Sequence, residues 1–410
     1  MAKGLAAGQA ESRRLDGIRV WDGTGDAGVC DLSWSGDRFD RVASADAERW
    51  PDLAVIPGLV DTHVHLVGHA GEPGRTDTLT WPLVTEREEQ VLHAAANAQR
   101  AMRHGVTTLR DLAADTAQAS LRRAFDDGVL PGPRLLASGP VGMTAGHMDL
   151  FTPPAHPLRG PTADSPDECR KLVRTWARAG LTGIKIATSG GVLSMGDKVG
   201  WRNHTRAEIA ATIDEAHALG MLVSAHAHSA EGIQVAIDEG VDSIEHGTEI
   251  TAAQAELLAA RRTPVAPTLL INELIAAGHG GVGPEPMAKA AALVARRDEL
   301  FAAAAAAGVR FVLGTDASGY FVRFGDQMAE VVRMSEVFGL DSPAALRAAT
   351  SDAADAIGLG DQVGRVASGY GADFVVLSGR PWLDITELTT DNIRAVVCRG
   401  RLVAGALPRP

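Results

Sequence analysis

The chain has 410 residues, 45% of them hydrophobic, and a formal net charge of −12 at neutral pH. The length exceeds that of most single domains, although α/β barrels of this size commonly form one unit. The acidic balance argues against nucleic acid or an anionic membrane as a partner, because both require a basic face.

The chain lacks features of export and membrane insertion. No stretch of about 18 apolar residues is present, and the first 15 residues lack the apolar core of a secretion signal. Cys30, Cys169 and Cys398 are widely separated and form no CxxC pair. We therefore expect a soluble, cytoplasmic protein in a reducing compartment.

Both ends of the chain have β character. Residues 17–21 and 31–34 alternate apolar and polar side chains beside Gly-containing turns, and residues 373–377 and 394–403 resemble them. We expect the two ends, residues 1–56 and 360–410, to pair into one small β-sandwich domain.

The helices of the middle region begin with capping sequences. Helix starts are predicted at three capping boxes: Thr85-x-x-Glu88, Ser165-Pro-x-Glu168 and Thr205-x-x-Glu208. Gly180 and Gly240 are placed where a helix would end. Short apolar segments follow these glycines repeatedly.

These apolar segments predict eight strands alternating with the helices. The predicted strands are residues 56–66, 106–112, 134–139, 183–186, 222–226, 242–246, 264–269 and 310–314. The pattern is typical of the α/β class and predicts a (β/α)8 TIM barrel over residues 57–359. A doubly wound open sheet is the alternative, but such a sheet normally binds a nucleotide through a Gly-rich first turn, whereas this first strand ends in histidines.

The first barrel strand contains Asp61-Thr-His-Val-His65. Residues two apart in a strand point to the same side, so His63 and His65 project together. A lone histidine is commonly a core residue with satisfied hydrogen bonds. Two histidines on one face of an apolar strand need partners for their ring nitrogens, and a metal ion supplies one.

Four other predicted strands also end in polar side chains. They contribute Lys185, His226 with His228, His246 and Asp316. Taken singly, Lys185 could be a paired or snorkelling lysine, His246 a core histidine and Asp316 a helix N-cap. The carboxyl ends of barrel strands meet at one mouth, so the convergence of five strand ends favours a metal-dependent active site.

The sequence resembles the amidohydrolase superfamily over nearly its whole length. The resemblance rests on these strand ends, on Pro57-Gly-Leu-Val-Asp-Thr-His-Val-His65 and on Gly371-Ala-Asp-Phe-Val-Val-Leu. The segments Ile184-Lys-Ile, Ser189-Gly-Gly-Val-Leu-Ser, Ala225-His-Ala-His and Ser243-Ile-Glu-His-Gly are similar to the Xaa-Pro dipeptidase and aminoacyl-amino-acid carboxypeptidase branch. That branch includes enzymes that cleave ochratoxin, and imidazolonepropionase is a more distant relative.

The resemblance implies a centre of two divalent metal ions, usually zinc. His63, His65 and Asp316 would bind one ion, His226 and His246 the other, and a carbamylated Lys185 would bridge them. An apolar barrel lowers the pKa of a lysine, so its neutral amine can capture carbon dioxide. Mononuclear deaminases of the superfamily lack this lysine.

The resemblance also implies roles for further residues. Asp316 would move the proton of the attacking water, His147 would face the substrate carbonyl, and His228 would line the pocket. A plain surface-loop histidine is the alternative for His147. The remaining histidines are expected at the solvent side or on helix surfaces: His69, His93, His104, His156, His204, His217 and His279.

The sequence therefore predicts a hydrolase for a small-molecule amide or peptide bond next to a free carboxylate: a dipeptidase, carboxypeptidase or N-acyl amino acid hydrolase. A metal-bridging hydroxide would attack the carbonyl, and Arg202 and Arg323 are candidate partners for the carboxylate. The alternative is a cyclic-amide hydrolase of the imidazolonepropionase or hydantoinase type, or a lactone or organophosphate hydrolase. A binding protein on a metal-free barrel is a third reading. Barrels of this kind often form homo-oligomers, but no helix stripe identifies an interface.

Overall fold

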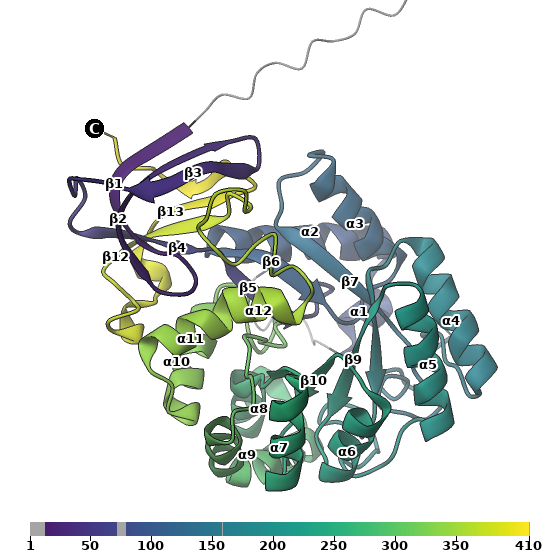
Figure 1. Cartoon of the computed structure of the whole chain (residues 1–410). Helices are drawn as coiled ribbons and strands as arrows, with labels where there is room; N and C mark the ends of the chain where they lie inside the picture. Colours follow the sequence, from purple (N-terminus) through teal and green to yellow (C-terminus); the bar gives the residue numbers. More distant parts are fainter. Residues whose placement is uncertain (1–12, 72–78, 158, 410) are drawn as a thin grey trace, which may run out of the picture.

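The computed structural model describes residues 13–71, 79–157 and 159–409. Within these residues the strands form two sheets of seven, one at the joined chain ends and one in the barrel (Figure 1). None of the described helices is long and apolar enough to span a membrane.

One sheet joins the two ends of the chain, as predicted. Its strands in spatial order are β14 (Arg401–Gly405), β13 (Ile393–Cys398), β12 (Phe374–Ser378), β4 (Leu53–Pro57), β1 (Arg13–Trp21), β2 (Asp26–Ser35) and β3 (Arg38–Ser44). The sheet is continuous and curls over a shared core, in which Trp34 packs edge-on against Phe374 at 5.1 Å. The segment predicted as one strand over 394–403 is a hairpin, because Arg399 and Gly400 turn with positive φ.

The barrel sheet is parallel throughout. Its strands in order are β5 (Leu59–Val64), β6 (Val106–Asp111), β7 (Arg134–Pro140), β8 (Gly183–Ala187), β9 (Leu222–Ala227), β10 (Ser243–His246) and β11 (Val265–Ala266). Residues 310–317 take the eighth place, with isolated parallel bridges from Phe311 to Val265 and from Ala317 to Val64. The predicted eighth strand therefore closes the barrel without forming a regular strand.

The predicted first strand, residues 56–66, is two strands in two sheets. β4 pairs with β1 and β12, and β5 pairs with β6. Gly58 separates them at a point where the backbone passes very close to the next strand, since a Cβ there would lie 2.1 Å from the hydroxyl oxygen of Thr107. An apolar run cannot reveal such a change of partner, because both strands are buried.

The seventh predicted strand, 264–269, is shorter than expected. β11 ends at Ala266, Thr268 has φ of 48°, and helix α8 (Leu269–Ala276) begins at once. The Glu330 carboxyl accepts hydrogen bonds from the backbone N–H groups of Leu269 and Leu270 at 2.5 and 3.0 Å. This distant side chain supplies the N-terminal cap that the local sequence lacks.

Helices cover the outside of the barrel (Figure 1). Besides α8, the α-helices of the described residues are α1 (Trp81–Val84), α2 (Arg87–Arg103), α3 (Thr116–Asp126), α4 (Pro166–Ala179), α5 (Arg206–Ala218), α6 (Ala230–Glu239), α7 (Ala252–Arg261), α9 (Pro284–Ala306), α10 (Gln327–Phe338), α11 (Ser342–Ala349) and α12 (Ser351–Ala356). Ser165 and Thr205 cap their helices as predicted. The capping box predicted at Thr85 is wrong, because α2 begins after Glu86 and has no side-chain cap.

Candidate metal centre

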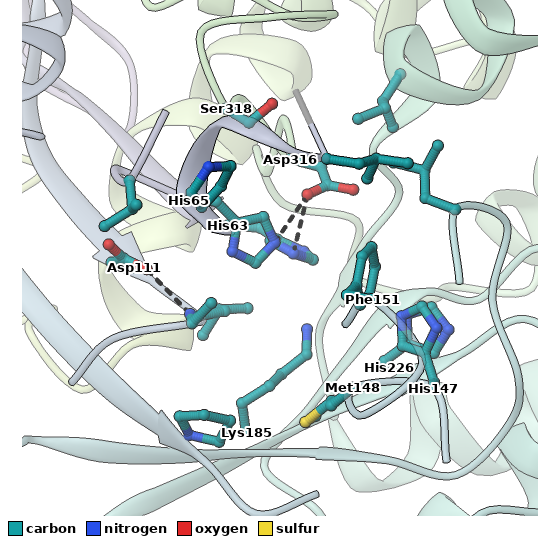
Figure 2. A pocket seen from close by; sticks show the side chains of 18 of the residues that line it. His63, His65, Asp111, His147, Met148, Phe151, Lys185, His226, Asp316 and Ser318 are labelled. Atoms are coloured by element: carbon teal, nitrogen blue, oxygen red, sulfur yellow. Dashed lines mark hydrogen bonds and ion pairs between the residues drawn. The ribbon is translucent and has the colours of Figure 1, made fainter. Parts of the chain in front are cut away.

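A cavity of about 450 Å³ opens at the carboxyl ends of the barrel strands (Figure 2). Its lining includes all eight residues predicted to bind metal or act in catalysis: His63, His65, His147, Lys185, His226, His228, His246 and Asp316. His63 with His65, and His226 with His228, project into the same space, as the alternation of strand side chains predicts. Five strand ends therefore converge as the sequence predicts.

Asp316 lies between the two histidines of the first strand. Its Oδ1 is 3.0 Å from Nε2 of His65 and 3.6 Å from Nε2 of His63. Ligand atoms of His63, His246 and Asp316 lie within 4.8 Å of one another. Burial alone would raise the pKa of Asp316, but the facing His63 and His65 and the Lys185 ammonium lower it to about 2. This half of the site presents a carboxylate to a cation.

The second group consists of His226, His228 and His246. One nitrogen of each ring lies within 4.8 Å of the others, and the rings of His228 and His246 are stacked at 4.5 Å. Burial, together with the neighbouring rings, lowers the pKa of His246 well below its ordinary value. Burial likewise lowers the pKa of His228 to about 3. The rings are therefore neutral and offer lone pairs, which is the form that binds metal.

Hydroxyl and carbonyl groups orient these three rings. Nδ1 of His228 is 2.7 Å from the Thr248 hydroxyl, and Nδ1 of His246 is 2.7 Å from the Thr268 hydroxyl. Such partners on the second nitrogen fix the direction of a metal-binding ring. The third ring, His226, has Nε2 against the carbonyl oxygen of Gly190 at 3.1 Å. Its Nδ1 therefore carries the free lone pair.

Lys185 extends from β8 into the cavity (Figure 2). The residue is 5% exposed, and its amine has neither a hydrogen bond nor an ion pair with a described residue. Burial lowers the pKa of the amine to about 8. A buried amine without a partner is costly, so its presence beside neutral imidazoles and a carboxylate fits a site for two divalent ions.

Three site residues have left-handed backbone conformations without being glycine. They lie at the ends of the sixth, seventh and eighth strand positions of the barrel, with φ of 70° at His246, 48° at Thr268 and 57° at Asp316. This conformation costs energy for a residue with a Cβ and commonly marks functional sites. At His246 it also breaks strand alternation, so that Glu245 and His246 both face the barrel interior.

A chain of contacts holds His147 beside His226. The two rings stack at 4.0 Å, and Nδ1 of His147 is 2.8 Å from the Ser194 hydroxyl. Ser194 donates to Asp197 at 2.7 Å, and Lys289 of α9 binds Asp197 at 2.9 Å. Gly191 allows this loop to close, since a Cβ there would lie 2.0 Å from the His147 ring. His147 is thus part of the cavity wall and not a plain surface histidine.

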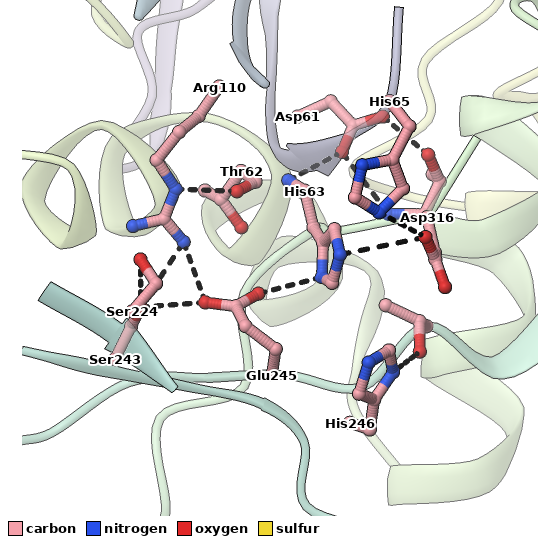
Figure 3. A network of polar contacts seen from close by, with 12 residues as sticks. Asp61, Thr62, His63, His65, Arg110, Ser224, Ser243, Glu245, His246 and Asp316 are labelled. Carbon is pink, nitrogen blue, oxygen red and sulfur yellow. Dashed lines mark hydrogen bonds and ion pairs between the residues drawn. The ribbon is translucent and has the colours of Figure 1, made fainter. Parts of the chain in front are cut away.

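Sequence reasoning missed two charged residues directly below the ligands. Glu245 and Arg110 are buried in the barrel interior and connect to His63 (Figure 3). Each is a charged residue inside a barrel strand, a position usually filled by an apolar side chain, which is the signal that could have identified them. The surface assignment of His204 is also wrong, because its ring is buried and contacts the Ala163 carbonyl at 3.2 Å.

The arginines predicted to bind a carboxylate lie elsewhere. Arg202 and Arg323 are both exposed, and neither lines the cavity. Arg87, at the start of α2, does line it and forms an ion pair with Asp115. No sequence pattern pointed to Arg87, because its approach to the cavity depends on how α2 packs beside the barrel.

This combination of a parallel barrel, a ring of strand-end histidines with an aspartate, and a buried lysine defines a metal-dependent hydrolase. Residues 54–403 match the model of the Amidohydrolase family, and the chain belongs to that family. The histidine clusters are consistent with a binuclear metal site.

The comparisons also identify individual relatives. The chain is 30% identical over 351 residues to ochratoxinase from Aspergillus niger, covering 81% of this chain and 71% of the relative. It is 27% identical over 388 residues to imidazolonepropionase from Deinococcus radiodurans, covering 89% of this chain and 88% of that protein. A crystal structure of a Xaa-Pro dipeptidase with bound methionine superposes with a TM-score of 0.85 at 29% identity, covering 96% and 99% of the two chains.

Proposed function

We propose that this protein hydrolyses an amide or peptide bond next to a free carboxylate, with two zinc ions and a carbamylated Lys185 at its centre. The observation that carries the proposal is the buried amine of Lys185, which lies among metal-type ligands with no partner in the described chain. Similarity to ochratoxinase and to a Xaa-Pro dipeptidase supports the choice of bond.

The ligands divide between two ions. His63, His65 and Asp316 would hold one, His226 and His246 the other, and a carbamate on Lys185 would give one oxygen to each. The neutral amine forms this carbamate by adding to carbon dioxide and losing one proton. When bound, the ions supply a water of lowered pKa and polarise the substrate carbonyl.

The protein side chains orient the substrate and move its protons. Asp316, ionised at neutral pH, accepts the proton of the attacking water and returns it to the leaving amine nitrogen. His147 and His228 line the cavity beside the ligands, where each can direct a ring nitrogen at the carbonyl oxygen. Leu83, Phe151 and Ile275 supply apolar wall for the rest of the substrate.

We assign recognition of the carboxylate to Arg87. Besides Lys185, Arg87 is the cation of the described residues that lines the cavity. Its guanidinium already pairs with the carboxylate of Asp115 and donates to Gln90 at 3.0 Å, which orients the fork. A planar guanidinium binds a carboxylate through two parallel hydrogen bonds.

A substrate screen tests the proposal. Protein reconstituted with zinc, cobalt or manganese is incubated with dipeptides, N-acyl amino acids, their carboxamides, cyclic amides and lactones. Chelator-treated protein is the control. We expect chelator-sensitive cleavage of the free acids, and a protein mass increased by one carbon dioxide on Lys185. Cleavage of cyclic amides or lactones alone would replace the proposal with the imidazolonepropionase-like or lactonase alternative.

A further inference from the structure

The barrel interior directly below the metal ligands is polar. Arg110 of β6, Ser224 of β9, and Ser243 and Glu245 of β10 point into it (Figure 3). Barrel interiors are usually filled by branched apolar side chains such as valine, isoleucine and leucine. The charged pair here is almost inaccessible to solvent, since Glu245 is 0% and Arg110 3% exposed.

Glu245 lies between Arg110 and His63. Its Oε1 accepts a hydrogen bond from Nη2 of Arg110 at 2.9 Å and another from the Ser243 hydroxyl at 2.7 Å. Its Oε2 lies 2.8 Å from Nδ1 of His63. Arg110 is anchored in turn, because its Nε donates to the backbone carbonyl of Thr62 at 2.6 Å. The three side chains connect β5, β6 and β10 across the barrel.

We propose that Glu245 is a positioning residue for the metal ligand His63, and that Arg110 fixes Glu245 for this purpose. The inference rests on metal binding by His63, which is part of the proposed function, and not on the identity of the substrate. A carboxylate beside Nδ1 places the ring proton on that nitrogen. The lone pair of Nε2 then points towards Asp316 and the cavity, as a ligand requires.

The burial of Arg110 and Glu245 favours a role in positioning over a role in stability. Burying two charges costs desolvation free energy that their attraction only partly offsets, so a buried ion pair is weak evidence for stabilisation. Among the described residues, Nη1 of Arg110 has no hydrogen-bond partner. Oε2 of Glu245 and Nδ1 of His63 lie 2.8 Å apart as an ion-pair contact without the alignment of a hydrogen bond. A barrel that needed only packing would be served by apolar residues at these positions. The charged pair instead directs one oxygen at the ligand ring.

The first test replaces Glu245 by glutamine, which keeps the volume and removes the charge. We expect Glu245→Gln to weaken binding of one of two Zn²⁺ ions by about 10- to 100-fold, measured by competition with a chromophoric chelator. With Co²⁺ as the probe, the visible absorption bands should shift, because the orientation of one ligand ring is no longer fixed. A folded variant with wild-type affinities for both ions and an unchanged cobalt spectrum would overturn the inference.

Two further variants separate positioning from general destabilisation. Asp373→Asn removes a buried carboxylate that pairs at 2.9 Å with Arg134, the first residue of β7, and it should leave both metal affinities unchanged. Arg110→Lys keeps the positive charge but loses the planar fork, and it should weaken the same ion as Glu245→Gln to a smaller extent. If Glu245→Gln does not fold, wild-type metal affinities in Arg110→Lys overturn the inference. If the wild-type protein binds no metal, both this inference and the proposed function are overturned.

Discussion

His63 and His246 face each other across the centre, with ring centroids 5.2 Å apart, and their Nδ1 atoms are held by different chemistry. Nδ1 of His63 lies against the Glu245 carboxylate, which a buried arginine binds from the other side. Nδ1 of His246 lies against the hydroxyl of Thr268, and His228 has the same arrangement with Thr248. The partner of the second ring nitrogen is therefore a charged carboxylate at His63 and a neutral hydroxyl at His246 and His228. We call these the charged half and the neutral half of the centre.

The difference determines how firmly the ring protons are placed. A carboxylate accepts only, so it fixes the proton of the facing imidazole on the near nitrogen. A hydroxyl can donate or accept, so the Thr248 and Thr268 contacts allow either tautomer of His228 and His246. We infer that the protons of His63 and His226 are fixed before metal binds, because a carboxylate and a backbone carbonyl face them. The protons of His228 and His246 can adjust to the ion and the substrate.

Replacing Asp316 should give the largest effect, because it removes the carboxylate of the charged half. We expect Asp316→Asn to reduce turnover by about 100- to 10,000-fold while metal remains bound, since the amide can bind an ion through its oxygen but cannot accept a proton. Turnover and metal content per chain are measured together. Asp361→Asn, at an exposed position, is the control. An Asp316→Asn variant with full activity would show that another group moves the proton.

Replacing Arg87 tests whether charge also selects the substrate. Arg87→Gln should lower kcat/KM for a free-acid substrate by about 10- to 100-fold, the typical value of a charge-assisted hydrogen bond. The carboxamide analogue should change little. Arg323→Gln, an exposed arginine outside the cavity, is the matched control. Equal losses for acid and carboxamide would remove Arg87 from carboxylate recognition.

Replacing Thr268 by valine tests the neutral half. The valine has similar shape but no hydroxyl, so Nδ1 of His246 loses its partner. We expect Zn²⁺ affinity to fall by less than about 10-fold, because a neutral hydrogen bond is weaker than a charge-assisted one. Thr248→Val, which removes the hydroxyl partner of His228, should lower Zn²⁺ affinity by a similarly small factor. A loss larger than that of Glu245→Gln would reverse the comparison between the two halves.

A pH-dependent effect is expected at Glu330, which caps α8 behind the neutral half. Burial raises the pKa of its carboxyl to about 8, from 4.5 in the unfolded chain. Between these values the folded state holds the proton that the unfolded state has released, so the free energy of unfolding falls as pH rises. The Tm of the wild type should therefore drop relative to Glu330→Gln between pH 5 and pH 8. Parallel Tm curves for the two proteins would show that Glu330 is ionised in the fold.

The sequence predicted which strand-end side chains meet at the cavity, because their placement follows from local periodicity. His63 and His65, like His226 and His228, share a face because strand side chains alternate, and barrel strand ends meet at one mouth. Local chemistry also predicted the helix starts at Ser165 and Thr205, where the cap and its partner lie three residues apart. These features require only neighbours in sequence or the general geometry of a barrel.

The tertiary structure alone decided how those ligands are supported and what else lines the cavity. Glu245 meets Arg110 and His63 from three different strands, and Glu330 caps a helix about 60 residues away. The division of the first predicted strand at Gly58 also depends on the close approach of Thr107. Strand pairing and helix packing bring these groups together across long sequence separations. Periodicity specifies which face a side chain occupies, but only the packed fold specifies what it meets there.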